Sequence, residues 1–175
     1  MNGKASTLLS ALDGLPEGAT VVEIGCVRFP GEIASDGWST YYLAQAATDR
    51  GWALHSVDID PGAVEHARTA ADGLACTVHH ADGASWLAAF PDAIDGLYLD
   101  GSADPGEAVE QYRAATLTAS PVVVIDDVQR IGDQQRGKAN LLLDVLADDG
   151  FDVRVVGTEP GYLMAVAHRS ARRGS

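Results

Sequence analysis

Cysteine is almost absent from this sequence of 175 residues, which contains only Cys26 and Cys76. Two cysteines without a Cys-x-x-C or Cys/His spacing cannot build a disulfide framework or a common zinc site, so we interpret both as small buried apolar residues. Long apolar runs are absent too, and no stretch approaches the ~20 residues that a membrane-spanning helix needs. Residues 1–14 lack both a basic start and a continuous apolar segment. We therefore expect neither a secretory signal nor membrane insertion, and a cytoplasmic location.

Basic residues are also scarce, because 12 Lys and Arg stand against 25 Asp and Glu and give a formal net charge of -13 at pH 7. Nucleic-acid affinity is built largely from basic side chains that neutralise phosphates. The composition therefore argues against a nucleic-acid partner and favours a small molecule. Most of the acidic residues serve solubility, whereas those that line a cleft would favour a cationic ligand.

Short apolar runs alternate along the chain with longer segments of helical period. This alternation is typical of βαβ units and predicts an α/β fold, a Rossmann-like three-layer sandwich around a seven-stranded, mostly parallel sheet. The expected helices span residues 4–13, 38–49, 61–72, 84–89, 105–117 and 136–149. The expected strands span residues 20–25, 53–58, 75–80, 94–99, 121–126, 151–157 and 162–168.

The last connection of the chain differs from the others. Only residues 158–161 separate the last two expected strands, and a turn this short cannot serve as a parallel crossover. The sheet should therefore end in an antiparallel hairpin. We expect a single domain over residues 1–175, with a core from 20 to 168, an N-terminal helix within 1–14 and a frayed polar tail at 170–175.

Acidic residues recur where the expected parallel strands end. In an open parallel sheet the ligand crevice lies outside the carboxyl ends of the strands, so acids at those ends converge on one pocket. The acids in these places are Glu23, Asp58, Asp82, Asp100 and the pair Asp126-Asp127.

The glycine pattern after the first strand separates two classes of ligand. A dinucleotide's pyrophosphate needs a G-x-G-x-x-G turn for close approach of backbone N–H groups. The residues that follow Gly25 break this pattern, and no phosphate-binding loop of the Gly-x-x-x-x-Gly-Lys type is present. Glu-x-Gly at the first strand end with Asp58 at the second suits a nucleoside that carries a cation, because a carboxylate can accept hydrogen bonds from both ribose hydroxyls.

Six short motifs occur in a fixed order over about residues 20–168. They are Val22-Glu23-Ile24-Gly25, Asp36-Gly37-Trp38-Ser39-Thr40, Asp58-Ile59-Asp60-Pro61, Asp82-Gly83-Ala84, Leu99-Asp100-Gly101-Ser102 and Asp126-Asp127. In this order the sequence resembles class I S-adenosylmethionine (SAM)-dependent methyltransferases, in particular the small O-methyltransferase branch related to catechol O-methyltransferase and to sugar and cephalosporin-pathway methyltransferases.

The resemblance implies roles for the residues that match these motifs. Glu23 and Gly25 should lie at the methionine end of SAM, Asp58 should accept hydrogen bonds from the ribose hydroxyls, and Asp100 should be a further cofactor-binding residue. Asp82, Gly83 and Ala84 should lie beside the adenine. Ser39 or Thr40 should bind the methionine carboxylate at the other end of the cofactor. For Ser39 and Thr40 the alternative is capping of the helix that follows.

The resemblance also implies a divalent metal ion that orients the acceptor oxygens. Asp100, Asp126 and Asp127 match its ligands, and all-oxygen ligation favours Mg²⁺, Mn²⁺ or Ca²⁺. The alternative is that these acids cap or solvate strand ends. The basic lysine of the catechol enzymes is replaced here by Ala103.

A different base is therefore needed. Asp104, His80 and Lys138 are the candidates beside Asp100 for a catalytic role.

From this resemblance we expect a SAM-dependent methyltransferase that acts on a small hydroxylated metabolite, in secondary metabolism, with N- and C-methylation left open. The chain has little beyond the core sheet to recognise an acceptor. We therefore expect either a homo-oligomer that completes the pocket or an open site for a bulky acceptor. The alternative function is a SAM-binding regulatory or scaffold protein without transferase activity.

Overall fold

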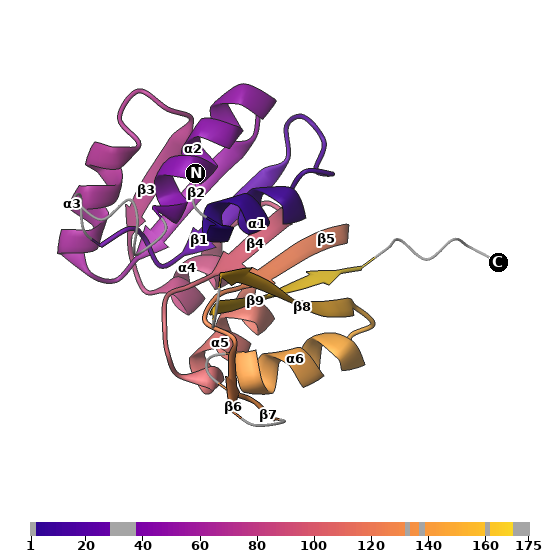
Figure 1. The fold of residues 1–175 in the computed structure, drawn as a ribbon. Coiled ribbons are helices and arrows are strands. Elements are labelled where there is room, and N and C mark those ends of the chain that lie inside the picture. The colour runs from indigo at the N-terminus through magenta and orange to yellow at the C-terminus, as the bar shows by residue number, and fades with distance from the viewer. Residues whose placement is uncertain (1–2, 29–37, 132–133, 137–138, 160–161, 170–175) are drawn as a thin grey trace.

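The apolar runs form the strands of one seven-stranded sheet in the computed structural model (Figure 1), which describes residues 3–28, 38–131, 134–136, 139–159 and 162–169. The sheet order is β3-β2-β1-β4-β5-β9-β8, with parallel pairing from β3 to β5 and antiparallel pairing of β9 with both β5 and β8. The strands are β1 (Thr20–Ile24), β2 (Ala53–Asp58), β3 (Cys76–His80), β4 (Ile94–Leu99), β5 (Leu117–Ile125), β8 (Asp152–Glu159) and β9 (Tyr162–His168). The predicted fold class, including the C-terminal antiparallel hairpin, is confirmed.

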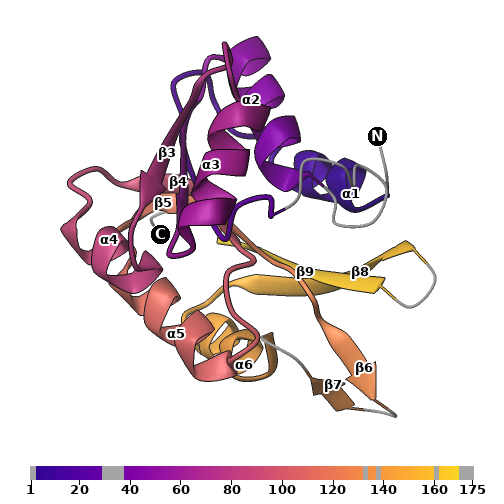
Figure 2. The same cartoon turned by 90° about the vertical axis from the view of Figure 1, so that its left-hand side faces the viewer.

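Helices cover both faces of this sheet (Figures 1 and 2). One face packs against α1 (Gly3–Ala11), α2 (Ser39–Arg50) and α3 (Pro61–Ala70), and the other against α4 (Gly83–Ala89), α5 (Pro105–Ala114) and α6 (Ala139–Asp148). Successive strand residues point to opposite faces. Val21 and Tyr98 accordingly belong to the core beneath α1 and α2, while Val22 and Leu97 belong to the core beneath α4, α5 and α6.

Three of these helices begin at an aspartate that caps them. A backbone N–H in the first turn would otherwise lack a partner, and a carboxylate at the N-cap position accepts its hydrogen bond. Asp60 accepts from the N–H of Ala63 at 2.9 Å, Asp82 from Ser85 at 2.8 Å, and Asp104 from Gly106 at 2.8 Å. Each cap also fixes the chain directly after a strand end, or near one, and so shapes the loops there.

The end of α5 and the start of β5 differ from the sequence-based expectation. The helix expected to reach residue 117 ends at Ala114, and β5 begins at Leu117 instead of 121. The pairing of β5 with β4 shifts register between Leu117 and Val122, a stretch that contains Pro121. Proline has no N–H to donate to a ladder, so an irregularity at this place is expected physically, although the sequence analysis took it as the strand's start.

A small antiparallel hairpin, β6 (Gln129–Ile131) and β7 (Gln134–Arg136), was not predicted. Figure 2 shows it projecting from the layered body beside α6. Because this hairpin uses residues up to Arg136, α6 begins at Ala139, later than the expected residue 136. None of the helices in the described part of the chain has the length and apolarity that crossing a bilayer requires.

Candidate functional site

A cleft of about 260 Å³ lies at the carboxyl ends of the parallel strands. The loops after β1, β2, β3 and β4 converge here because neighbouring parallel strands end at the same edge of the sheet. The first turns of α5 close one side. The residues that line the cleft include Gly25, Asp58, Ile59, Asp82, Gly83, Ala84, Gly101, Ser102, Glu107, Glu110 and Gln111.

Gly25 allows the ends of β1 and β4 to meet at the floor of this cleft. Its φ of +96° is a conformation that favours glycine. A Cβ at this position would lie 2.6 Å from the carbonyl carbon of Asp100 and 2.6 Å from the nitrogen of Gly101. Gly25 also donates its N–H to the carbonyl of Val57 at 2.9 Å. The tight approach of three strand ends therefore depends on the missing side chain.

Asp58 presents a carboxylate that the backbone holds in place. One oxygen accepts the N–H of Cys26 at 2.7 Å, and the other accepts the N–H of Asp60 at 2.8 Å. Each carboxylate oxygen can accept two hydrogen bonds, so both oxygens keep acceptor capacity on the side of the cleft. A pair of ligand hydroxyl groups matches this arrangement.

The opposite part of the cleft is formed by the start of α4. Hydrogen bonds from Ser85 hold the pKa of the exposed Asp82 carboxyl below its ordinary value, so the group is ionised at neutral pH. Gly83 is needed for close packing, because a Cβ there would lie 2.7 Å from Cγ2 of Ile24. Asp82, Gly83 and Ala84 all line the cleft, as the motif comparison predicted for one wall of a nucleoside site.

Two further acids in the cleft, Glu107 and Glu110, were missed by the sequence analysis. Both are exposed and stand on α5 three residues apart, a spacing that places side chains on one helix face. The helix-start signal Asp104-Pro105 could have located them, because it fixes the helix phase. Their charges add to those of Asp58 and make the cleft strongly acidic.

Glu23 lies beneath the cleft and is fully buried. Its carboxylate accepts hydrogen bonds from the hydroxyls of Ser39, Thr40 (2.7 Å) and Ser56. Burial raises the pKa of Glu23 to about 7, although the three hydroxyl donors oppose the shift. Thr40 also accepts the N–H of Val27 at 3.0 Å.

These contacts differ from the helix-capping role weighed for Ser39 and Thr40. The N-cap of α2 is Trp38, which makes no side-chain capping bond, and the two hydroxyls instead join α2 to β1 through Glu23. In the structure Glu23, Ser39 and Thr40 are a buried network that fixes the β1 end. Their direct contact with a ligand stays a prediction.

A second group of charged residues, which we call the Lys4 cluster, lies at the ends of β4 and β5. It consists of Lys4, Tyr98, Asp100, Asp126 and Asp127. Lys4, from α1, forms ion pairs with the fully buried Asp126 and with Asp100, the latter at 3.3 Å. The Tyr98 hydroxyl lies 3.2 Å from a carboxylate oxygen of each of these two acids. Ligand atoms of Asp100, Asp126 and Asp127 all lie within 4.8 Å of one another.

Charge coupling sets the protonation of the Lys4 cluster. Burial alone would lower the pKa of Lys4, but the carboxylates of Asp100 and Asp126 raise it above its ordinary value, so the side chain is an ammonium. Burial and the charge of Asp100 raise the pKa of Asp126, and Lys4 opposes this shift. Asp127 has a φ of +52°, an uncommon conformation for a residue other than glycine and one that aspartate tolerates better than most.

Two of the candidate bases, His80 and Asp104, have other hydrogen-bond partners in the described part of the chain. His80 ends β3, three places from β4 in the sheet, and its Nε2 lies 3.0 Å from the carbonyl oxygen of Ile59. Asp104 uses its carboxylate to cap α5. Lys138 lies outside the described residues, as do Asp36 and Gly37 of the second motif.

Comparison with known proteins identifies the architecture of this site. A family model described as a methyltransferase domain matches residues 32–128, which is more than half of the chain and contains the motifs from Asp58 to Asp126. The chain belongs to the methyltransferase-domain family. None of the curated proteins compared with it gives a significant match.

Solved methyltransferases share the fold of this methyltransferase domain at low sequence identity. A SAM-dependent O-methyltransferase from Thermotoga maritima matches with a TM-score of 0.71 and 16% identity, over 98% of this chain and 66% of its own. A precorrin-6y C5,15-methyltransferase from Geobacter metallireducens matches with a TM-score of 0.67 and 16% identity, over 95% and 88%. A SAM-dependent methyltransferase from Geobacter sulfurreducens, in complex with S-adenosyl-L-homocysteine, matches with a TM-score of 0.57 and 18% identity, over 89% and 68%.

Lys4 is the residue of this methyltransferase domain that the sequence analysis missed most plainly. It stands four residues before Leu8 and eight before Leu12, both fully buried, and so lies on the stripe of α1 that faces the core. A charged residue on such a stripe signals a buried partner, because an unpaired charge in the core is costly. That signal was present in the sequence.

Proposed function

We propose that this methyltransferase domain binds SAM in the strand-end cleft and transfers its methyl group to a hydroxyl group of a small metabolite. The observation that carries the proposal is the position of Asp58 in the cleft. Its two oxygens are fixed by backbone donors and keep the capacity to accept a vicinal pair of hydroxyls such as those of a ribose.

The charge of the cleft supports SAM over a dinucleotide. Asp58, Asp82, Glu107 and Glu110 line it, and such a set repels a pyrophosphate and attracts a ligand with ammonium and sulfonium groups. The tight turn at Gly25 supports the same choice, because it brings β4 against β1 and offers no glycine-rich loop. The residues present therefore fit the nucleoside and the cation of SAM.

We assign parts of the ligand to parts of the cleft as follows. Asp58 accepts the ribose hydroxyls, and Asp82 with Gly83 and Ala84 contacts the adenine. Asp100 and Gly101, at the β4 end, lie toward the methionine part. SAM in this site supplies an electrophilic methyl group on its sulfonium.

The chain's own residues then have to position the acceptor hydroxyl and accept its proton. Gly101 and Ser102 line the cleft, and Asp100 of the Lys4 cluster directly precedes them in the chain. We therefore propose that the Asp100 carboxylate accepts the hydrogen bond of the acceptor hydroxyl and takes its proton as the methyl group is transferred. The ion pair with Lys4 fixes the direction of this carboxylate.

Two alternatives accompany this proposal. A divalent metal ion is favoured by the three grouped carboxylates and opposed by the ammonium of Lys4, which pairs with two of them. A SAM-binding protein without transferase activity is favoured by the pairing of Lys4, which as a paired ammonium does not serve as a free base. A homo-oligomer that completes the acceptor pocket is a further part of the proposal.

A transfer assay separates an enzyme from a binding protein. The purified chain is incubated with methyl-labelled SAM and a panel of catechols, sugars and other hydroxylated acceptors, each with an amine-bearing counterpart. The proposal expects label in a hydroxylated product, and Asp100→Asn should lower kcat at least about tenfold, a larger effect than its effect on the affinity for S-adenosylhomocysteine. Label only in amine products would contradict O-methylation. SAM binding without methyl transfer to any acceptor of the panel would favour the regulatory alternative.

A further inference from the structure

Two of the three carboxylates expected to hold a metal ion already form ion pairs with a cation of the protein itself. Asp100, Asp126 and Asp127 offer ligand atoms within 4.8 Å of one another, a spacing that suits a divalent ion. The ammonium of Lys4 contacts the Oδ2 atoms of Asp126 and Asp100. The question is therefore whether an ion and this ammonium can share the same oxygens.

Lys4 is held in this place by the packing of α1. Ala5 and Leu8 are buried with it, and Leu12 continues the same row of side chains into the core beneath α2. The Lys4 side chain is only 11% exposed, and that of Asp126 is fully buried. A lysine on a loose terminal segment could swing aside for an ion, whereas this one is anchored by the same helix face that completes the core.

A second donor reaches the same two oxygens. The hydroxyl of the fully buried Tyr98 lies 3.2 Å from Oδ2 of Asp100 and 3.2 Å from Oδ2 of Asp126. These atoms are thus directed toward an ammonium and a phenol hydroxyl, both of which are hydrogen-bond donors. Mg²⁺ and Ca²⁺ need six or more oxygen ligands with lone pairs directed at the ion, at about 2.0–2.6 Å. With Lys4 in place, these carboxylate oxygens do not fit a divalent ion as ligands.

We propose that Lys4 replaces the divalent cation in this chain, and that the acidic ends of β4 and β5 are neutralised by a residue of α1 instead of by a metal. Lys4 is then a positioning residue, since it acts through Asp100 and Asp126. Removing its ammonium should leave a carboxylate cluster that accepts a metal ion. Methyl transfer without a metal follows as well, a consequence that rests on the proposed function.

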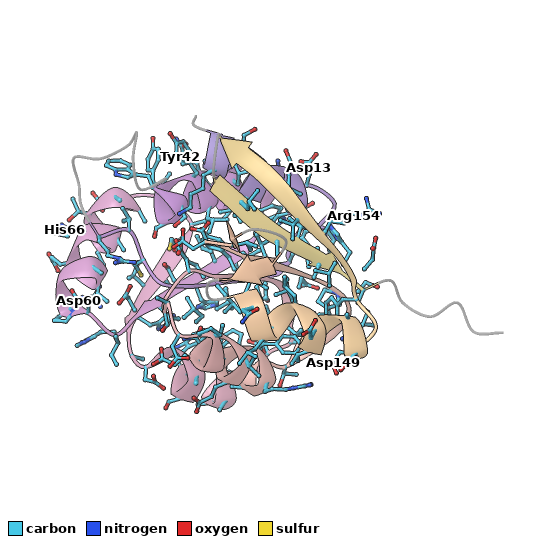
Figure 3. All side chains as sticks on the ribbon, turned by 60° about the horizontal axis from the view of Figure 1, so that its bottom comes forward. Asp13, Tyr42, Asp60, His66, Asp149 and Arg154 are labelled. Carbon is cyan, nitrogen blue, oxygen red and sulfur yellow. The ribbon has the colours of Figure 1, made fainter. Side chains whose placement is uncertain are left out.

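The test measures Mn²⁺ binding, with Mn²⁺ alone as the probe. Wild type, Lys4→Met and the double variant Lys4→Met/Asp126→Asn are titrated calorimetrically with Mn²⁺, and their thermal unfolding is followed with Mn²⁺ and with a chelator. Methionine is an unbranched side chain one heavy atom shorter than lysine and carries no charge. The control is Arg154→Met, which removes one positive charge from an exposed pair with Asp152 at the surface of β8 (Figure 3).

The proposal expects wild type and Arg154→Met to show no saturable Mn²⁺ binding and no change of Tm. Lys4→Met should bind one Mn²⁺ at least tenfold more tightly than wild type, with a Tm that rises when Mn²⁺ replaces the chelator. The double variant should lose this binding. One Mn²⁺ bound by wild type as tightly as by Lys4→Met would overturn the proposal, and so would a folded Lys4→Met that binds none.

If Lys4→Met fails to fold, the wild type and Asp126→Asn decide the matter. Saturable 1:1 binding of Mn²⁺ by wild type that Asp126→Asn abolishes would overturn the proposal, whereas no binding by wild type supports it. S-adenosylhomocysteine binding is measured on the same wild-type samples. If wild type does not bind S-adenosylhomocysteine, this counts against the proposed function only, because the Mn²⁺ result does not depend on the cleft.

Discussion

Lys4, at the start of the first helix, forms an ion pair with Asp126, which directly follows strand β5. The N-terminal helix is therefore part of the site edge of the sheet. Deleting residues 1–14 would remove the partner of a buried carboxylate and also Leu8, which is fully buried. Such a truncation, which from the sequence would look like a test of acceptor recognition, reports mainly on folding, and point substitutions in the cleft are better tests.

The buried carboxyl of Glu23 predicts a specific dependence of stability on pH. Its pKa is raised to about 7, whereas in the unfolded chain it titrates near 4.5. Between these values the native state holds a proton that the unfolded state has lost, so this group lowers the free energy of unfolding as the pH rises through the window. Above about pH 7 its contribution no longer changes.

Glu23→Gln removes this group's titration while retaining a side chain of the same shape. The difference in unfolding free energy between wild type and variant should therefore shift by up to ~3 kcal/mol between pH 4.5 and 7, to the disadvantage of wild type at the higher pH. Urea unfolding at several pH values measures this. A constant difference across the window would show that Glu23 titrates as in the unfolded chain.

Gly25 predicts a large effect from the smallest possible substitution. Gly25→Ala places a Cβ 2.6 Å from backbone atoms of Asp100 and Gly101 in a left-handed conformation. The strain should cost ~2 kcal/mol or more, lower Tm by about 4–8 °C and weaken binding of S-adenosylhomocysteine. Gly14→Ala is the control, because a Cβ there meets nothing within 4 Å. Similar Tm values for the two variants would contradict the close approach of β1 and β4.

Glu110 predicts a difference between the methyl donor and its product. SAM carries a sulfonium charge that S-adenosylhomocysteine lacks. Glu110→Gln should therefore weaken the binding of SAM up to about fivefold and weaken the binding of S-adenosylhomocysteine less. The extra loss for SAM should shrink as salt is raised, because the group is exposed. Equal losses for both ligands at low salt would mean that Glu110 does not act through charge.

Local signals in the sequence were sufficient for most of the fold. Asp60 before Pro61 marks the start of α3, and the alternation of apolar runs with helical segments predicts that most of the sheet is parallel. The hairpin β6–β7 escaped because its polar residues carry no apolar alternation. The start of β5 was misplaced because Pro121 was interpreted as its beginning, whereas the strand continues through an irregularity there.

The site was predictable only where a residue acts through its place on a strand end. Asp58 and Asp82 line the cleft as their motifs indicated. Glu23 is buried beneath the cleft, and its surroundings depend on three hydroxyls that come from α2 and β2. No local pattern in the sequence indicates that these groups will meet. The same limit applies to Lys4: its burial indicates a charged partner, but that partner, Asp126, is distant in the sequence and no local pattern identifies it.

Calorimetric titration with S-adenosylhomocysteine tests the central claim most directly, on wild type, Asp58→Ala and Asp49→Ala. Asp49 is an exposed acid on α2 and controls for the change in net charge. We predict micromolar binding to wild type and Asp49→Ala. Asp58→Ala loses a charge-assisted hydrogen bond, so its binding of S-adenosylhomocysteine should be weaker by about 1.5–3 kcal/mol, or roughly 10- to 150-fold. No binding to wild type, or equal affinity in all three proteins, would contradict a SAM site at this cleft.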